Sequence, residues 1–388
     1  MLKMAVGHSE EWEADAAAAE ILADCAEQLD GQTPQAGLLL ANHDIDVAQF
    51  LGAVRAAHPD LELIGCTTLA PMSSTGGYGE GSTTLTLFAS DVLDFTTGLG
   101  TGVATDVRSA SADAVAQAMA KTDKPVALCI TTPSVEDVDP VEVAKGLGAA
   151  LGSGVPVFGG GAVPDYPVAT PWRGGIQFHG DRVVLDSMPV LLVSGPLTVS
   201  VGIDHGWTPV GNRAVVTRAV GDLVYEIDHE PVANFYKHYL GTNDAPAIAN
   251  PLAVYEGHGD RHVLRAPVSH DDVEGAITFL GGIPEGAEVQ ITLASQDEIL
   301  DGASASIRDA MEGFPDSMEP EGALVVSCSV RMMLLGSQAS SELERIRDRL
   351  GEDVPVTGFY GLGEIAPLEI GSDVRFHNET CVTVLMGT

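Results

Sequence analysis

The sequence predicts an α/β fold of layered, mixed but mainly parallel sheets with helices, built from about three repeated units in the order β-α-β-α-β-loop-β. Two observations lead to this prediction. Short apolar segments with strand character alternate with helical patterns, which is typical of parallel strands joined by crossover helices. The same order of elements then recurs along the chain, which indicates one structural unit used several times. A length of 388 residues also suits two or three domains.

The first copy covers residues 1–92. An Ala-rich helical pattern follows its first strand, and Asp44 or Asp46 is placed to cap its second helix. A loop rich in Gly and Ser separates the third strand from the last. The expected elements are a strand at Lys3–Gly7, a helix at Glu13–Leu29, a strand at Ala36–Ala41, a helix at Asp46–Ala57, and strands at Leu61–Thr68 and Ser82–Ser90.

The second copy covers residues 93–220 and repeats this order. Its second helix has a favourable start, because Asp139 can cap it and a proline occupies the first turn. The expected elements are a strand at Asp94–Ala104, a helix at Ala110–Ala120, a strand at Pro125–Thr131, a helix at Pro140–Leu151, and strands at Val155–Ala162, Gly175–Gly180 and Met188–Gly195.

The third copy lies at the C-terminal end, after a connecting region of alternating strand patterns between Gly206 and Gly282. We place the boundary between two domains near Gly221, which divides the chain into residues 1–220 and 221–388. The last strand of each copy follows a loop without a helix and is expected to join its sheet antiparallel. The expected elements are a strand at Glu288–Ser295, a helix at Asp301–Met311, a strand at Ala323–Ser329, a helix at Ser341–Leu350, and strands at Val354–Pro367 and Glu379–Gly387.

The charge is strongly acidic, with 55 Asp and Glu against 19 Lys and Arg and a formal net charge of −36. Nucleic acid is an improbable partner, because phosphate contacts require clustered basic residues. A hydrophobic content of 45% argues against intrinsic disorder. The composition favours a halophilic protein adapted to high intracellular salt; an acidic protein from an ordinary cytoplasm is the alternative.

The chain carries no apolar run of about 18 residues and no secretory h-region at its start. We therefore expect a cytoplasmic protein without a membrane partner. The cysteines are odd in number, scattered and free of CxxC spacing, so neither a disulfide framework nor a metal site is expected. They are Cys25, Cys66, Cys129, Cys328 and Cys381.

Glycine ends the third strand of every copy, in the sequences Gly65-Cys66-Thr67, Gly159-Gly160-Gly161 and Gly358-Phe359-Tyr360. Ligands of open α/β sheets bind beyond the carboxyl ends of parallel strands, and glycine lets the backbone approach them closely. The alternative is that these glycines only form the turn into the next loop. No nucleotide fingerprint, P-loop, nucleophile elbow or HExxH motif accompanies them.

Arg331 follows an apolar strand that ends at Cys328, where a guanidinium can hold a carboxylate or phosphate in a bidentate fork. The alternative is an internal ion pair with Glu342 or Glu364. Polar residues that could complete a site for a zwitterion, with Glu364 facing its amine, are Tyr360, Glu364, His377 and Asn378. Alternatively, His377 and Asn378 close the turn into the last strand.

The stretches IGCTTLAP (Ile64–Pro71), HGWTPVG (His205–Gly211) and VTRAVGDLVYEIDHEPVANFYKHYLG (Val216–Gly241) resemble a FIST N-terminal domain. The stretches SCSVR, GFYGLGEIAP and FHNETCVTVL, between Ser327 and Leu385, resemble a FIST C-terminal domain. The resemblance runs from about Gln35 to Gly387. It departs from the family at Leu69-Ala70-Pro71, where many relatives carry a glutamate.

The resemblance implies a sensory module that binds small ligands such as amino acids, and one branch of the family is associated with haem and nitric oxide. A separate signalling protein would supply the output. The ligand-binding positions that it implies are Gly65, Cys66, Thr67, Cys328, Arg331, Tyr360, Glu364, His377 and Asn378.

Two other functions stay open. Haem would need an axial ligand such as His179, His205 or His377. A cysteine-dependent enzyme would use Cys66 or Cys328 as a nucleophile beside a base. The absence of a recognisable catalytic motif favours a binding protein over an enzyme.

Overall fold

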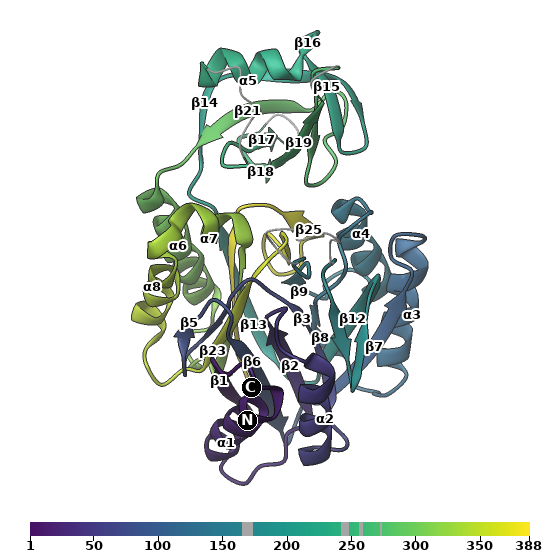
Figure 1. Ribbon diagram of the computed structural model, residues 1–388, viewed down its shortest axis with the longest axis vertical. Coiled ribbons are helices and arrows are strands. Elements are labelled where there is room, and N and C mark those ends of the chain that lie inside the picture. The colour runs from purple at the N-terminus through teal and green to yellow at the C-terminus, as the bar shows by residue number, and fades with distance from the viewer. Residues whose placement is uncertain (165–173, 242–247, 256–258, 272–273) are drawn as a thin grey trace.

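The computed structural model describes residues 1–164, 174–241, 248–255, 259–271 and 274–388. The chain forms an α/β body and, at one end of it, a smaller body rich in strands (Figure 1). Three mixed sheets of six strands build the α/β body, and helices cover their outer faces. The inner faces of the three sheets share one apolar core, to which Val6, Leu191 and Val326 each contribute from a different sheet.

The first sheet has the strand order β1-β6-β2-β3-β10-β11. Helices α1 (Ala14–Leu29) and α2 (Val47–Ala57) pack on its outer face through a second apolar cluster. Asp46 caps α2, because its side chain accepts a hydrogen bond from the backbone N–H of Gln49. The strands are β1 (Leu2–Ser9), β6 (Thr83–Ser90), β2 (Ala36–Ala41), β3 (Glu62–Thr67), β10 (Gln177–His179) and β11 (Arg182–Val184).

The second sheet has the order β25-β24-β9-β8-β12-β7 and is covered by α3 (Val107–Met119) and α4 (Pro140–Leu151). The prediction for α4 is confirmed at both ends, and Asp139 caps it as expected. The strands are β25 (Val374–His377), β24 (Glu364–Pro367), β9 (Val157–Gly160), β8 (Val126–Thr131), β12 (Ser187–Ser194) and β7 (Asp94–Thr101).

The third sheet has the order β13-β26-β22-β23-β4-β5. Helices α6 (Gln296–Gly313) and α8 (Ser340–Leu350) cover it, and the short α7 (Ser329–Leu335) follows β22 directly. The strands are β13 (Thr198–Asp204), β26 (Cys381–Gly387), β22 (Gly322–Cys328), β23 (Val356–Gly361), β4 (Pro71–Ser73) and β5 (Gly77–Tyr78).

A hairpin from another part of the chain completes each sheet. Strands β10 and β11 join the first sheet, β24 and β25 the second, and β4 and β5 the third. The three hairpins pair in corresponding places, because Phe178, Ile365 and Met72 lie opposite Gly65, Gly159 and Gly358 respectively. The three sheets therefore exchange hairpins in a ring.

The expectation of mainly parallel sheets is wrong. Among the described residues, the parallel pairs are β2–β3, β8–β9 and β22–β23, and the other strand pairs are antiparallel. The reason lies in the last strand of each unit. Strand β6 lies between β1 and β2 and is antiparallel to both, so the two strands that a crossover helix connects are separated.

The segment Glu288–Ser295 is also not the first strand of the third sheet. Strand β21 (Glu288–Leu293) belongs to the smaller body, and β13 takes the place beside β26 instead. The smaller body is thus inserted between β13 and α6. In sequence, the strands of its eight-stranded sheet begin with β14 (Thr208–Val220) and end with β21. The sheet and helix α5 (Val232–Leu240) pack around an apolar cluster of their own.

The remaining strands of the inserted body are short. They are β15 (Leu223–Ile227), β16 (Glu230–Pro231), β17 (Leu252–Tyr255), β18 (His262–Arg265), β19 (Pro267–Asp271) and β20 (Ala276–Phe279). Gly221, near which the sequence placed a domain boundary, lies in the turn between β14 and β15. Across the described ranges, no helix combines the length and apolar character needed to cross a membrane.

Candidate functional site

Arg331 lies in α7 and is completely buried. Its Nε and Nη2 donate to Oε1 of Glu342, at 2.8 and 2.5 Å. Nη2 also donates to the carbonyl of Ile299 at 2.8 Å. Nη1 donates to the carbonyls of His205, at 2.6 Å, and of Glu379, at 3.1 Å. These five contacts use the five N–H groups of a guanidinium, so none is left for a ligand.

Glu342 is just as fully engaged. Its Oε2 accepts hydrogen bonds from the hydroxyls of Tyr360, at 2.7 Å, and Ser327, at 2.8 Å. Burial, the largest single effect, lowers the pKa of Arg331, but the charge and hydrogen bonds of Glu342 together with the nearby Cys381 and Tyr360 outweigh it, so the pKa is raised. Of the two interpretations of Arg331, the internal ion pair with Glu342 therefore agrees with the geometry. Tyr360 belongs to this network and not to an open site.

Glu364 and Glu379 form a second buried group beside Cys328. Glu364 Oε2 accepts from the backbone N–H of Thr380 at 3.1 Å and from its hydroxyl at 2.6 Å. Glu364 Oε1 and both carboxylate oxygens of Glu379 have no hydrogen-bond partner among the described residues. Burial raises the pKa of Glu364 to about 8, against the hydrogen bonds from Thr380 that lower it. Burial and then Glu364 also raise the pKa of Glu379, which is held at a positive φ of 58°.

His377 and Asn378 lie at the end of β25, and Asn378 connects the two bodies. His377 Nε2 contacts the carbonyl of Ala366 at 3.0 Å, and burial lowers the pKa of the imidazole to about 3. The Oδ1 of Asn378 accepts from the backbone N–H of Ala266, in the inserted body, at 3.0 Å. Their contacts agree with a structural role at the turn before the last strand.

The glycines at the strand ends have one shared geometry. A Cβ on Gly65, Gly159 or Gly358 would lie 1.9, 1.9 or 2.3 Å from a carbonyl oxygen of the neighbouring parallel strand. These positions exclude a side chain because the paired backbones approach too closely. The hydroxyl of Thr67 donates to the carbonyl of Val163 at 2.9 Å. Gly65 and Thr67 thus hold the sheet together locally.

The cysteines are poor nucleophiles. Each is buried, and burial raises the pKa of the thiols. For Cys25 and Cys381 the pKa rises to about 12. A thiol becomes reactive when its surroundings lower its pKa, so Cys66 and Cys328 lack the environment of a catalytic residue.

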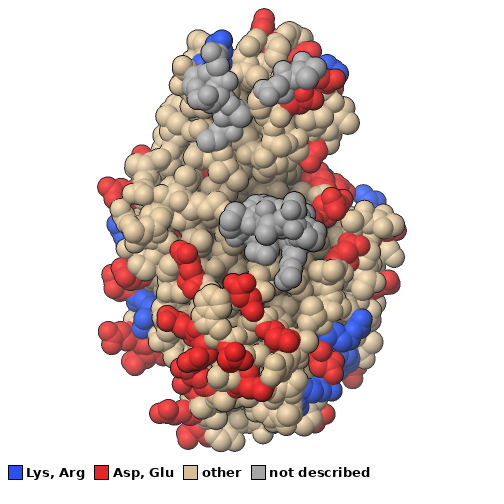
Figure 2. All heavy atoms as spheres, viewed as in Figure 1, with Lys and Arg blue, Asp and Glu red and all other residues tan. Residues whose placement is uncertain are grey.

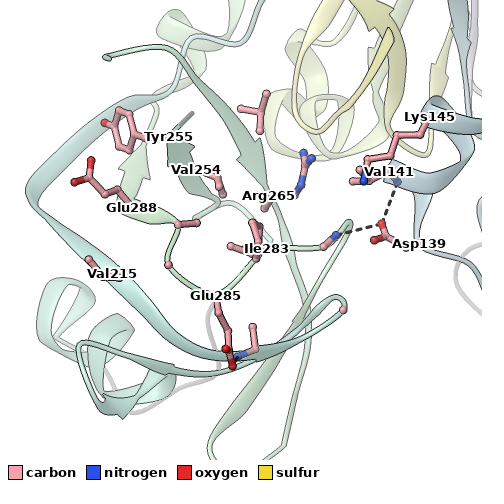
Figure 3. Close-up of a pocket in the computed structure, with 17 residues that line it drawn as sticks. Asp139, Val141, Lys145, Val215, Val254, Tyr255, Arg265, Ile283, Glu285 and Glu288 are labelled. Atoms are coloured by element: carbon pink, nitrogen blue, oxygen red, sulfur yellow. Dashed lines mark hydrogen bonds between the residues drawn. The ribbon is translucent and has the colours of Figure 1, made fainter. Parts of the chain in front are cut away.

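A cleft of about 800 Å³ lies where the inserted body meets the N-terminal part of α4 (Figure 3). Strands β17 and β18 and the loop 282–287 line it from one side, and Asp139, Val141 and Lys145 line it from the other. Its volume falls within the usual range of small-molecule sites, and such sites often lie between domains.

Arg265, the last residue of β18, lines this cleft and is 6% exposed. Its Nη1 donates to the carbonyls of Leu264, at 2.8 Å, and Phe376, at 3.2 Å, whereas its Nε has no partner. Across the described ranges, no carboxylate forms an ion pair with it. Burial lowers its pKa to about 10, partly offset by Asp139, so the guanidinium keeps its charge at neutral pH.

Each acidic group around the cleft accepts a hydrogen bond or forms an ion pair, although, among the described residues, the half-buried Asp139 does so only through Oδ1. Asp139 Oδ1 accepts from the backbone N–H groups of Val141, at 3.0 Å, and Gly282, at 3.2 Å, as the dashed lines of Figure 3 indicate. Glu288 pairs with Arg213 at 3.1 Å. The exposed Glu285 accepts from the backbone N–H of Ala219 at 3.1 Å. Within the part of the chain that the structure describes, Arg265 is therefore a buried charge of this cleft without an ion pair, although the charge of Asp139 acts on it from a distance.

Sequence reasoning missed Arg265, although a signal was present. HVLRAP ends an apolar strand with an arginine, as SCSVR does. The two arginines differ in their tertiary contacts: Glu342 forms an ion pair with Arg331, whereas no carboxylate of the described residues forms one with Arg265. Among the described residues, no group of His, Cys, Asp and Glu could hold a metal ion.

The chain matches the model of the FIST N domain at residues 35–230 and that of the FIST C domain at residues 233–367. It is 28% identical over 212 residues to an uncharacterized protein of Mycobacterium tuberculosis, a match that covers 50% of this chain and 53% of the relative. It thus spans about half the length of that relative. A beta-hexosaminidase of Xanthomonas campestris is 32% identical over 95 residues, which cover 22% of this chain and 29% of the enzyme.

Among solved structures, two cyanuric acid hydrolases align over 100% of this chain and 99% of theirs. The enzyme from A. caulinodans has a TM-score of 0.37 at 11% identity, and the other has 0.40 at 10%. The two family models together cover most of the chain, from the first sheet through the inserted body to β24. The protein belongs to the FIST family, with a FIST N domain followed by a FIST C domain.

Proposed function

We propose that this protein is a small-ligand-binding sensory module, and that it holds the anionic group of its ligand with Arg265 in the cleft between the two bodies. Arg265 is the observation that carries the proposal. A buried guanidinium without a counter-ion costs several kcal/mol, and a bound anion would offset that cost. FIST domains are associated with sensory signalling, and a separate protein would receive the signal.

Amino acids and related small polar molecules are the ligand class that the family suggests. The carboxylate of such a ligand, or of a related organic acid without an amine, would meet Arg265, and not Arg331, whose donors are all occupied. The other positions expected from the sequence would then not contact the ligand and would instead stabilise the structure around the cleft. Asn378, for example, would hold the chain next to Arg265 through Ala266.

The two alternative functions have weaker support. Haem does not fit His377, because its Nε2 is occupied by the Ala366 carbonyl. It does not fit His205 either, because that ring is half-buried and its Nδ1 accepts from the backbone N–H of Trp207, which leaves the ring proton on Nε2. A cysteine-dependent enzyme would require a thiol with a lowered pKa, whereas burial raises the pKa of Cys66 and Cys328.

The test is a thermal-shift screen of amino acids and small carboxylates against the wild type and Arg265→Gln. A ligand at a hundredfold excess over its Kd should stabilise the wild type by about 2.7 kcal/mol. Removing a hydrogen-bonding charge costs about 1.5–3 kcal/mol, so we expect Arg265→Gln to weaken binding at least tenfold. Arg218→Gln is the matched control, since Arg218 lies in the inserted body and is exposed. Equal shifts in Arg265→Gln and the wild type would refute the site.

The same proposal includes the organisation of the chain. Residues 1–92 would hold one copy of the unit, and residues 93–220 a second copy together with β13 and β14. Residues 221–388 would hold the rest of the connecting β region and of the third copy. Support comes from the three parallel strand pairs and from the matching positions of Gly65, Gly159 and Gly358.

Adaptation to a cytoplasm rich in salt is the proposed reason for the acidic surface. Figure 2 shows Asp and Glu side chains gathered over the lower part of the α/β body, with few Lys and Arg between them. Mutual repulsion among these charges should destabilise the fold in dilute buffer, and salt at 1 M screens it within about 3 Å. We expect the melting temperature to rise between low and molar KCl in calorimetry. An unchanged value would contradict halophilic adaptation.

A further inference from the structure

The charges and the walls of the cleft define the class of ligand more narrowly. We infer that the ligand is an organic anion with an apolar body, such as a medium-chain carboxylate, and that a free ammonium group on it would weaken binding. This inference rests on the proposed function, because it concerns the same cleft and the same guanidinium.

The first step is the balance of charge. Arg265 is buried and has no ion pair among the described residues, so one anionic group has a place to bind. An ammonium group would need a carboxylate that is both buried and free. Asp139 is only half-buried, its Oδ1 holds the backbone of α4 and of Gly282, and its charge already acts on Arg265. Glu288 is paired with Arg213. Glu285 is exposed, where an ion pair contributes little.

The second step is the lining. Val141 from the α/β body and several apolar side chains from the inserted body line the cleft together with Arg265. Two of them, Ile283 at 1% exposed and Val254 at 7%, are already part of the interior. The apolar residues that line the cleft include Val141, Val215, Ala219, Val254, Val263 and Ile283. Such walls favour an aliphatic or aromatic body, and they penalise an ammonium group that loses its water without gaining a partner.

The third step concerns other anion donors near the cleft. The N-terminus of α4 cannot bind the ligand's anion through its first N–H groups, because Asp139 accepts from Val141 N–H and Glu142 N–H bonds the Asp139 carbonyl. Lys145 lies at the edge, where it is 63% exposed and bonded to Glu142. A single buried cation therefore sets the charge of the ligand, which favours a monoanion over a polyanion.

The experiment measures Kd by calorimetry for acetate, butyrate, hexanoate and norleucine, which is hexanoate with an added 2-amino group. We expect affinity to rise about fourfold for each methylene buried, and norleucine to bind at least tenfold more weakly than hexanoate. Hexanoate and norleucine should each lose at least tenfold in affinity for Arg265→Gln, and each should bind Arg218→Gln as tightly as the wild type.

One further variant tests the apolar wall, and two outcomes would contradict the inference. Val215→Thr, which keeps the shape of a 38% exposed wall residue, should reduce the gain per methylene without changing the binding of acetate. Norleucine binding as tightly as hexanoate, with both dependent on Arg265, would overturn the ligand class and leave the cleft as the site. Binding that ignores Arg265→Gln, or no binding by any of the four compounds, would overturn this inference together with the proposed function.

Discussion

Replacing Glu342 with Ala is expected to lower the free energy of unfolding by about 3–5 kcal/mol, because it leaves the charge of Arg331 buried and unpaired. Both side chains of this pair are 0% exposed. The substitution also removes the acceptor for the hydroxyls of Ser327 and Tyr360. Urea unfolding at constant salt would measure the loss, and Glu342→Gln, which keeps the shape and an acceptor, should fold if the Ala variant does not.

The matched control removes the pair as a whole. Arg331→Met combined with Glu342→Leu deletes both charges and should recover a large part of the stability, as hydrophobic replacements of buried ion pairs often do. A loss below about 1 kcal/mol in Glu342→Ala, the level of an exposed pair, would contradict the buried position of this ion pair. Ligand binding should persist in every variant that folds.

Glu364 makes stability depend on pH in a defined direction. Burial raises its pKa from 4.5 to about 8 in the folded protein. Between these two values the folded state holds a proton that the unfolded state releases. The stabilising contribution is therefore complete below about pH 4.5 and is lost as the pH rises through 8. Glu379, whose pKa burial also raises, adds to the effect in the same direction.

We expect the free energy of unfolding of the wild type to fall with pH across this window. In Glu364→Gln the free energy of unfolding should fall less steeply with pH. The difference in slope should be up to about 1.4 kcal/mol per pH unit, the value for one proton. Denaturant titrations at several pH values in one salt concentration would measure it. Glu369→Gln, an exposed residue of the same segment, is the control. Equal slopes in the wild type and Glu364→Gln would show that Glu364 is ionised in the folded state.

The sequence predicted those parts of the fold that local patterns determine. Helix α4 begins at Pro140 and ends at Leu151 as expected, because a capping Asp, a proline in the first turn and a following glycine mark its ends. Strand β2 was predicted equally well from its apolar run. Strand β21 was assigned to the wrong sheet, because an inserted body separates β13 from α6 and no local pattern records that interruption.

The candidate site was harder to predict from the sequence for a related reason. Arg265 and Arg331 each end or follow an apolar strand, and local sequence does not distinguish them. Glu342, which neutralises Arg331, lies on the next α-helix, α8, 11 residues further along the chain. Whether a buried arginine is neutralised depends on tertiary contacts, so the residue without a counter-ion emerges only from the folded arrangement.

The ring of exchanged hairpins has a consequence for how the chain must fold. The third sheet needs β4, which pairs with β23 from the opposite end of the sequence, at Met72 and Gly358. Contacts between such distant segments carry a large loop-closure entropy and slow the folding of the whole molecule. During synthesis the hairpin β4–β5 is made long before its partner, so its strand edge stays open to mispairing with other chains until translation is nearly complete.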